Sequence, residues 1–272
     1  MKIDVCISPC PNDTFMFHAL LNGLIDTGDL ELTPHFADIE SLNESLVAGD
    51  VTVSKFSYAI LPLICDNYRV LNSGSALGRG NGPLLVGKEG VKKDNLRGLR
   101  VAAVPGKYTT ANMLMDKMFP EVTDKPEFIF SDIADAVQSG EVDAGVLIHE
   151  GRFTYQNCGL SLIADLGLEW EVYCGMPLPL GGIAVSRELP YEIQRELTIL
   201  LRKSIRYAQE NPSASCDWIK FHAQEMDEEV IGQHINLFVN RYSEELGEEG
   251  RNAVKILAGH HIPEEKWSSL FI

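Results

Sequence analysis

The first half of the chain alternates short apolar runs with stretches in which apolar residues recur every three or four positions. Apolar runs of this length predict strands, and the periodic stretches predict helices. The predicted strands are KIDVCIS, LELTPHF and VTVSKFSYAIL, and the predicted helices are residues 14–24 and IESLNESLVAGD, which closes at Gly49. Strands and helices in this order predict α/β units with a mainly parallel sheet.

The alternation starts again after the glycine-rich stretch SGSALGRGNGP. The strands predicted there are LRVAAVP, EFIFSD and VDAGVLI, and the helices are TTANMLMDKMF and IADAVQSGE. The two halves also contain a weak internal echo. ESLVAGDVTVSKFSYA and DAVQSGEVDAGVLIHEG both run from a helix through a glycine and an acidic residue into a strand.

From Pro190 onward the pattern is helical. The predicted helices are YEIQRELTILLRKSIRYAQEN, SASCDWIKFHAQEM, EEVIGQHINLFVNRYSEEL and a last one near residues 248–258. Two crossings rich in glycine and proline, near 78–83 and 175–182, bracket the second alternating unit. We therefore expect a first lobe of residues 1–88 and 183–272 and an inserted second lobe of residues 89–182. Each lobe would have a central sheet flanked by helices, with a ligand cleft between the lobes.

Composition narrows the class of protein. A net charge of −16 argues against a nucleic-acid or anionic-lipid partner, because both need clustered lysine and arginine. The six cysteines form no C-x-x-C pair, and no histidine, cysteine or acidic cluster has metal-ligand spacing, so no metal is expected. The N-terminal residues enter a strand pattern directly, and the longest apolar run is too short to span a bilayer. These features predict a soluble, reduced, cytoplasmic protein.

A strand, a glycine turn and a helix start meet in VPGKYTTANML. A phosphate-binding P-loop is excluded, because its first glycine would fall on Val101 and Tyr108 follows Lys107. Thr109 and Thr110 at the helix start offer hydroxyl and backbone N–H groups to a carboxylate or hydroxyl oxygen. The alternative is a simple helix N-cap.

Two other strand ends carry candidate chemistry. His149 ends the apolar strand in VDAGVLIHEGR, and a histidine at the carboxyl end of a sheet strand suits a general base. The alternative is a hydrogen-bonded or capping histidine. In SKFSY, Lys55 and Ser57 offer donors at the end of the third strand, or else belong to a solvated loop. Ser75 is a further candidate contact in the glycine-rich stretch.

The loop SPCPNDTFMFHALL follows the first strand and holds polar residues between two prolines and a helix. The prolines stiffen the loop, and Asn12 or Asp13 is expected to cap the helix that starts near Thr14. Asn12 and Asp13 are also candidates for contact with a ligand, ranked below the residues named above. Cys10 lacks any local feature that would activate a thiol, so it is interpreted as inert.

Taken together, SPCPNDTFMFHAL, SKFSYAIL, VPGKYTTANML and GVLIHEGRFTY strongly resemble the 1,4-dihydroxy-6-naphthoate synthase family. These enzymes act on cyclic dehypoxanthinyl futalosine in menaquinone biosynthesis, and the resemblance runs over nearly the whole chain. It implies a two-lobed fold similar to the type II periplasmic binding proteins.

The resemblance also implies a reaction and a site. It implies a carbon–carbon lyase that removes the sugar-derived fragment of a small carboxylate substrate without a metal or organic cofactor. The family's base matches His149, and its substrate-contacting residues match Lys55, Phe56, Ser57, Thr109 and Thr110.

Two alternatives remain open from the sequence. Chorismate dehydratase, a sister enzyme of the same fold and pathway, is the nearest one, and the opening motif and the IHEG strand end favour the synthase over it. The other is a non-catalytic, solute-binding-like protein, for which an export signal would be expected. The oligomeric state is not predicted.

Overall fold

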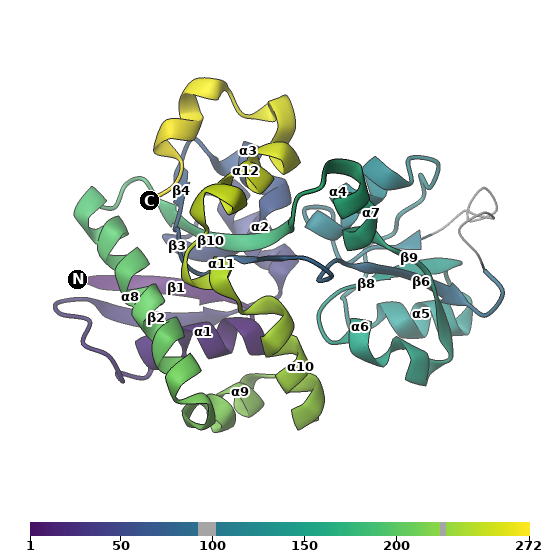
Figure 1. Ribbon diagram of the computed structural model, residues 1–272, viewed down its shortest axis with the longest axis horizontal. Helices are drawn as coiled ribbons and strands as arrows, with labels where there is room; N and C mark the ends of the chain where they lie inside the picture. Colours follow the sequence, from purple (N-terminus) through teal and green to yellow (C-terminus); the bar gives the residue numbers. More distant parts are fainter. Residues whose placement is uncertain (92–101, 224–226) are drawn as a thin grey trace. The chain divides into compact units, whose positions relative to one another are not determined.

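The computed structural model describes residues 1–91, 102–223 and 227–272, and the chain folds into two compact units. The first unit is formed by both ends of the chain, Met1–Gly78 and Pro179–Ile272, and the second by Arg79–Leu178. Figure 1 follows the chain through both units. The first unit thus ends at residue 78, before the predicted 88, and resumes at 179, before the predicted 183.

The early boundary has a local cause in the contacts of the segment that leaves the first unit. The guanidinium of Arg152 donates to the backbone oxygens of Gly80 and Gly82, the former at 2.9 Å. Gly82 also lies so close to Gly167 that a Cβ on Gly82 would come within 2.2 Å of the Gly167 backbone. The segment is therefore packed into the second unit before its first strand begins.

The sheet of the first unit is only partly parallel. Its strands, in spatial order, are β2 (Glu31–Phe36), β1 (Lys2–Ile7), β3 (Val53–Ser57), β10 (Leu178–Ser186) and β4 (Tyr68–Val70), and β5 (Ala76–Gly78) also pairs with β10. β1 runs parallel to β2 and β3, while β10 runs antiparallel to β3 and β4. The parallel pairs are joined through helices α1 (Pro11–Leu21) and α2 (Ile39–Ala48), as parallel pairs require. β10 enters directly from the second unit and needs no such crossover.

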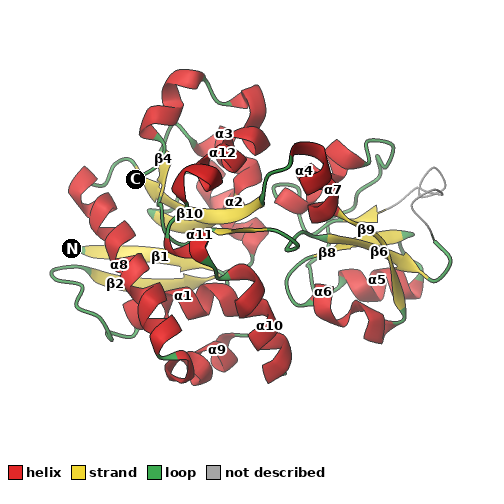
Figure 2. Cartoon of the chain, in the orientation of Figure 1, coloured by secondary structure: helices red, strands yellow, loops and turns green. Residues whose placement is uncertain are grey.

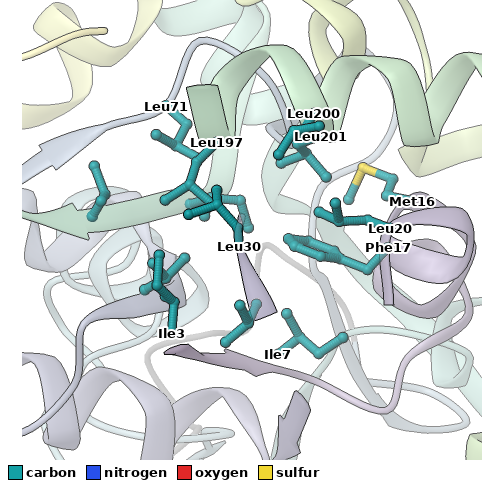
Figure 3. Close-up of a cluster of buried hydrophobic side chains, with 14 of the residues drawn as sticks. Ile3, Ile7, Met16, Phe17, Leu20, Leu30, Leu71, Leu197, Leu200 and Leu201 are labelled. Atoms are coloured by element: carbon teal, nitrogen blue, oxygen red, sulfur yellow. The ribbon is translucent and has the colours of Figure 1, made fainter. Parts of the chain in front are cut away.

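The core of the first unit lies between this sheet and two helices, α1 and α8 (Tyr191–Glu210). Figure 3 shows Met16, Phe17 and Leu20 of α1 facing Leu200 and Leu201 of α8. The other helices of the unit are α3 (Leu61–Ile64), α9 (Cys216–His222), α10 (Glu228–Phe238), α11 (Arg241–Glu244) and α12 (Gly247–Ala258), with short 3₁₀ turns at Tyr58–Ile60, Pro212–Ser215, Gly259–His261 and Glu264–Ser269. Figure 2 shows that the C-terminal part of the chain is almost wholly helical, as predicted.

The second unit has a smaller sheet that is mostly antiparallel. Its strands, in spatial order, are β7 (Ala102–Ala103), β8 (Ala144–Leu147), β6 (Leu84–Lys88) and β9 (Leu160–Asp165), and its helices are α4 (Thr110–Met118), α5 (Ile133–Ser139), α6 (Gly151–Thr154) and α7 (Leu166–Cys174), with a 3₁₀ turn at Tyr155–Cys158. Among the strands that the structure describes in this unit, β7 and β8 are the pair that runs parallel. The mainly parallel sheet predicted from the alternation is therefore wrong for this unit, because β6 lies between β8 and β9 and is antiparallel to both.

Several predicted elements shift or break. The first helix begins at Pro11 rather than near Thr14. The long tail helix predicted over EEVIGQHINLFVNRYSEEL is two helices, because Asn240 and Ser243 form a capping box that starts α11. EFIFSD is not a strand: a single bridge joins Val104 and Glu127. Residues 99–101 of the predicted strand LRVAAVP and 224–226 of the predicted helix SASCDWIKFHAQEM lie outside the described residues.

The internal echo is visible in the backbone. α2 ends at Gly49 with φ of 82°, and α5 ends at Gly140 with φ of 88°. Both values lie in the left-handed region where glycine is the usual residue. Each glycine leads into a strand associated with candidate chemistry. β3 carries Lys55, and β8 precedes the turn that holds His149.

Among the described residues, no helix combines the length and apolar character that a bilayer crossing requires.

An aromatic cluster in the first unit contains two histidines, the buried His18 and the half-buried His222. The His222 ring stacks on Phe36 with centroids 4.0 Å apart and meets Trp218 edge-on at 4.3 Å. His18 lies beside Trp218, and its Nδ1, like Nε2 of His222, is buried without a partner among the described residues. Burial lowers the pKa of both histidines, because a protonated imidazole loses its hydration there.

We expect acid to destabilise the first unit through this cluster. Because the folded pKa is lowered, stability is full above the unfolded pKa of about 6.5 and declines as the pH falls toward the folded pKa. His222→Phe keeps a ring in the stack and removes one titration, so its melting temperature should fall less than that of the wild type on acidification to about pH 5. The exposed substitution His261→Phe is the control and should follow the wild type. An equal loss in His222→Phe and the wild type would contradict the assignment.

Candidate active site

The centre of the first unit's candidate site is a buried ion pair. Asp13, in the first turn of α1, and Lys55, on β3, are 1% and 5% exposed. Lys55 Nζ donates to Asp13 Oδ1 at 2.6 Å. The same carboxylate accepts from Ser8 Oγ at 2.7 Å and from Asn12 Nδ2 at 2.8 Å. The carboxylate thus has three donors, one of them a cation, as a charged group in the protein interior requires.

The predicted capping role of Asn12 or Asp13 is wrong. Cys10 is the N-cap of α1 and makes no side-chain capping bond, and Pro11 occupies the first helical position. Proline suits that position because its φ is already helical and it has no N–H to leave unpaired. Asn12 and Asp13 therefore lie inside the first turn, and their side chains are used for the ion-pair network instead of the helix end.

Lys55 and Ser57 project from the same face of β3, because side chains two residues apart in a strand share a face. The Lys55 ammonium has three N–H donors, and within the described residues only Asp13 accepts one of them. The Ser57 hydroxyl accepts from Asn43 Nδ2 at 3.0 Å, and no described residue accepts its own proton. Two N–H groups of a buried cation and a hydroxyl thus remain for an anionic or hydroxyl ligand.

Phe56 and Ser75 are part of the interior. Phe56 is fully buried on the opposite face of β3 and meets Tyr58 edge-on with ring centroids 5.1 Å apart. The Tyr58 hydroxyl bonds Ser75 Oγ at 2.8 Å, and burial raises the pKa of Tyr58 well above its usual value. Phe56 and Ser75 thus pack against or bond other protein groups. They are therefore weaker candidates for ligand contact than Lys55 and Ser57.

His149 lies in the second unit, in the turn that follows β8. Its φ of 51° makes it the one residue other than glycine with a left-handed backbone among those described. This conformation is uncommon for a residue with a side chain and is found where the surroundings enforce it. The half-buried ring packs against Phe130, with centroids 4.8 Å apart. Phe130 belongs to the stretch predicted as a strand, so that stretch instead lines the histidine turn.

Thr109 is the N-cap of α4, which is the simpler of the two interpretations drawn from the sequence. Its Oγ1 accepts from the Asn112 N–H at 3.2 Å and donates to the Gly106 oxygen at 2.8 Å. Thr110 is the first residue of the helix, and both threonines are buried. The hydroxyl of Thr109 is therefore engaged locally, while the first turn of any helix leaves backbone N–H groups without a partner inside the helix.

The candidate residues fall into two groups. Asn12, Asp13, Lys55, Ser57 and Ser75 belong to the first unit, and the structure joins Asn12, Asp13 and Lys55 by hydrogen bonds. Thr109, Thr110 and His149 belong to the second. None of the six cysteines, all of which the structure describes, forms a disulfide, and the described residues contain no group of three histidine, cysteine or acidic side chains placed to hold a metal ion.

Sequence reasoning missed three residues of the first unit's site, Ser8, Asn43 and His234. The signal that could have found two of them is a polar residue at an apolar position of a helix. Asn43 is fully buried on α2, and His234 stands between Ile231 and Phe238 on the buried stripe of α10. Its Nε2 lies 2.9 Å from Asn12 Oδ1.

Comparison with known proteins supplies the biological context. The sequence pattern of a family described as menaquinone biosynthesis matches residues 3–261. The chain belongs to this menaquinone biosynthesis family. Two curated relatives, from Thermus thermophilus and Streptomyces coelicolor, are each named 1,4-dihydroxy-6-naphthoate synthase and are each 43% identical to it. The alignment with the Thermus protein covers 91% of this chain and 89% of that protein. The alignment with the Streptomyces protein covers 93% of this chain and 90% of that protein. The predicted resemblance is confirmed, and it identifies an enzyme of menaquinone biosynthesis.

Solved structures agree on the fold. A protein of Archaeoglobus fulgidus is 37% identical and superposes with a TM-score of 0.88 over 94% of this chain and 95% of its own. A Candida albicans protein with the generic periplasmic-binding-protein fold gives 0.71 at 13% identity, over 100% of this chain and 96% of its own. The predicted α/β, periplasmic-binding-protein-like fold is therefore confirmed.

Removing one member of the buried ion pair should strongly destabilise the first unit. Lys55→Met and Asp13→Asn each leave one member without its partner, so each should lower the free energy of unfolding by roughly 3–5 kcal/mol. The double variant should lose less than the sum of the single losses, because neither charge remains. Denaturant unfolding of the four proteins measures this coupling.

The control for this cycle is the exposed pair Lys2–Glu31, whose charges lie 3.3 Å apart. Removing it should change stability little, because solvent screens surface pairs. Additive losses at Lys55 and Asp13 would show that the two charges do not stabilise each other.

Thr109→Val should lower the free energy of unfolding by about 1 kcal/mol, because the Asn112 N–H loses its cap. Thr109→Ser keeps the hydroxyl and should retain most of the stability. Thermal unfolding compares the three proteins. A Val variant as stable as the wild type would remove the capping role from Thr109.

Proposed function

We propose that the chain converts cyclic dehypoxanthinyl futalosine to 1,4-dihydroxy-6-naphthoate, acting as a carbon–carbon lyase without a metal or organic cofactor. The observation that carries the proposal is the identity of 43% to two relatives of this name over about nine-tenths of the chain. The four motifs that suggested the family come from both units, so the match is not confined to a shared scaffold segment. The substrate is a small-molecule carboxylate.

In this proposal His149 is the general base. The turn after β8 is held in a strained conformation, and its imidazole rests on Phe130 rather than in the core. A base that takes a proton from the substrate must have an imidazole nitrogen oriented toward it, and such a base typically contributes ~10²–10⁴-fold to the rate. The left-handed turn and the contact with Phe130 hold the half-buried imidazole outside the core, which supports this role.

Lys55 and Ser57 bind the carboxylate of the substrate. A buried ammonium with two remaining N–H donors is matched in charge to a carboxylate, and the Ser57 hydroxyl adds a neutral donor from the same strand face. Asp13 holds the ammonium in place through the ion pair before the ligand arrives. Phe56 supports this pair through packing, and Thr109 and Thr110 offer the start of α4 to oxygen atoms of the substrate.

His149→Ala should abolish most of the turnover of cyclic dehypoxanthinyl futalosine, with kcat reduced by about 10²–10⁴-fold and product affinity nearly unchanged. Following the ultraviolet change measures turnover, and calorimetry with 1,4-dihydroxy-6-naphthoate measures binding. His35→Ala is the matched control, because that histidine is exposed and bonds only Asp4 among the described residues.

Each alternative corresponds to a different outcome. Turnover of chorismate alone by the wild type would replace the synthase with the dehydratase, and ligand binding without turnover of either compound would indicate a non-catalytic binding protein. Unchanged turnover in a folded His149→Ala variant would remove His149 from the mechanism while leaving the reaction in place.

A further inference from the structure

The ion-pair network of the first unit extends to a residue far along the chain. His234, on α10, is 1% exposed, and its Nε2 lies 2.9 Å from Asn12 Oδ1. Helix α10 packs on α1, which carries Asn12 and Asp13, and the two helices lie side by side in Figure 1. A polar contact between residues 222 positions apart thus reaches the first turn of α1.

The network determines which nitrogen of His234 carries the proton. A carboxylate only accepts, so the Asn12 group that meets Asp13 Oδ1 at 2.8 Å must be its NH₂. The amide oxygen of Asn12 therefore faces His234. Because that oxygen only accepts, the hydrogen bond requires a proton on Nε2 of His234.

The bonds from His234 and from Lys55 converge on Asp13 Oδ1. His234 donates to Asn12, Asn12 donates to Asp13, and Asp13 Oδ1 also accepts from Lys55. Oδ2 of Asp13 accepts from Ser8, so both carboxylate oxygens have partners. Every member is buried, and in a buried network the loss of one partner leaves the next group unsatisfied.

We propose that His234 is a positioning residue for carboxylate binding: it fixes Asn12, which orients Asp13 and so directs the remaining N–H groups of Lys55 toward the ligand. This inference rests on the proposed role of Lys55 as the carboxylate-binding cation. His234 does not touch the ligand in this account and takes no part in proton transfer.

A packing role predicts a different response to substitution. The His234 ring also contacts Phe238, with centroids 4.6 Å apart, so a side chain that only fills space would serve if packing were the whole role. His234→Leu fills the space and removes the donor. His234→Gln loses the ring and keeps an N–H that can reach Asn12. The two variants thus separate the hydrogen bond from the ring.

The experiment compares the affinity of the wild type and of both variants for the simple probe 2-naphthoate, measured by calorimetry, together with KM and kcat for cyclic dehypoxanthinyl futalosine. His234→Leu should weaken 2-naphthoate binding and raise KM by about tenfold or more with a much smaller change in kcat. His234→Gln should stay close to the wild type. Gln233→Leu, at an exposed position of the same helix, is the control and should behave as the wild type.

Histidine-ring ¹⁵N NMR of the wild type adds a measurement that does not depend on the variants folding. The His234 signal, assigned by its absence in His234→Gln, should show a proton on Nε2. A proton on Nδ1 alone, wild-type affinity in a folded His234→Leu variant, or equal losses in both variants would overturn the proposal.

The outcomes also separate this inference from the proposed function. If the wild type binds 2-naphthoate but does not turn over cyclic dehypoxanthinyl futalosine, the reaction is wrong and the affinities still decide the role of His234. If the wild type does not bind 2-naphthoate, the carboxylate site and the inference fail together, whatever the reaction.

Discussion

The ion pair between Lys55 and Asp13 is the constraint around which the first unit's site is organised. Two charges at this depth are tolerated only if each keeps partners, and the fold supplies them from three elements. β3 places the cation, the first turn of α1 places the carboxylate, and Ser8, in the loop between β1 and α1, gives the second carboxylate oxygen its donor. The early helix start at Pro11 follows the same logic, because it brings Asp13 into the turn that faces β3.

Secondary structure could be predicted from the sequence where a segment determines its own conformation. The strand β1, the helix α2 and its closure at Gly49 follow from spacing and from the backbone freedom of glycine. The break between α10 and α11 was missed because the hydrophobic period continues across it, while the capping box at Asn240 interrupts the helix. EFIFSD has the composition of a strand, yet its half-buried Phe128 packs against the core of the second unit and Phe130 packs on His149.

Contacts between side chains that are far apart in the sequence could be predicted only in part. Lys55, Asp13 and Asn12 were each identified as polar residues near strand ends, but their pairing depends on how α1 and β3 meet. His234 carries a signal only in hindsight, as a polar residue on an apolar stripe, since its partner lies in the first turn of another helix. Family resemblance named residues without their partners, and so it could not distinguish Thr109 as a cap from Thr109 as a ligand.

The two candidate functional groups are held by different physical means, and this has a consequence for substitution. Lys55 is directed by a network of side chains, so changes at several distant positions can reorient it without touching β3. His149 is held in a left-handed backbone conformation that costs of order 1–3 kcal/mol for a residue with a side chain. Glycine would relieve that strain and remove the imidazole. A strained turn that retains a titratable side chain is therefore better explained by what the side chain does than by what the turn needs.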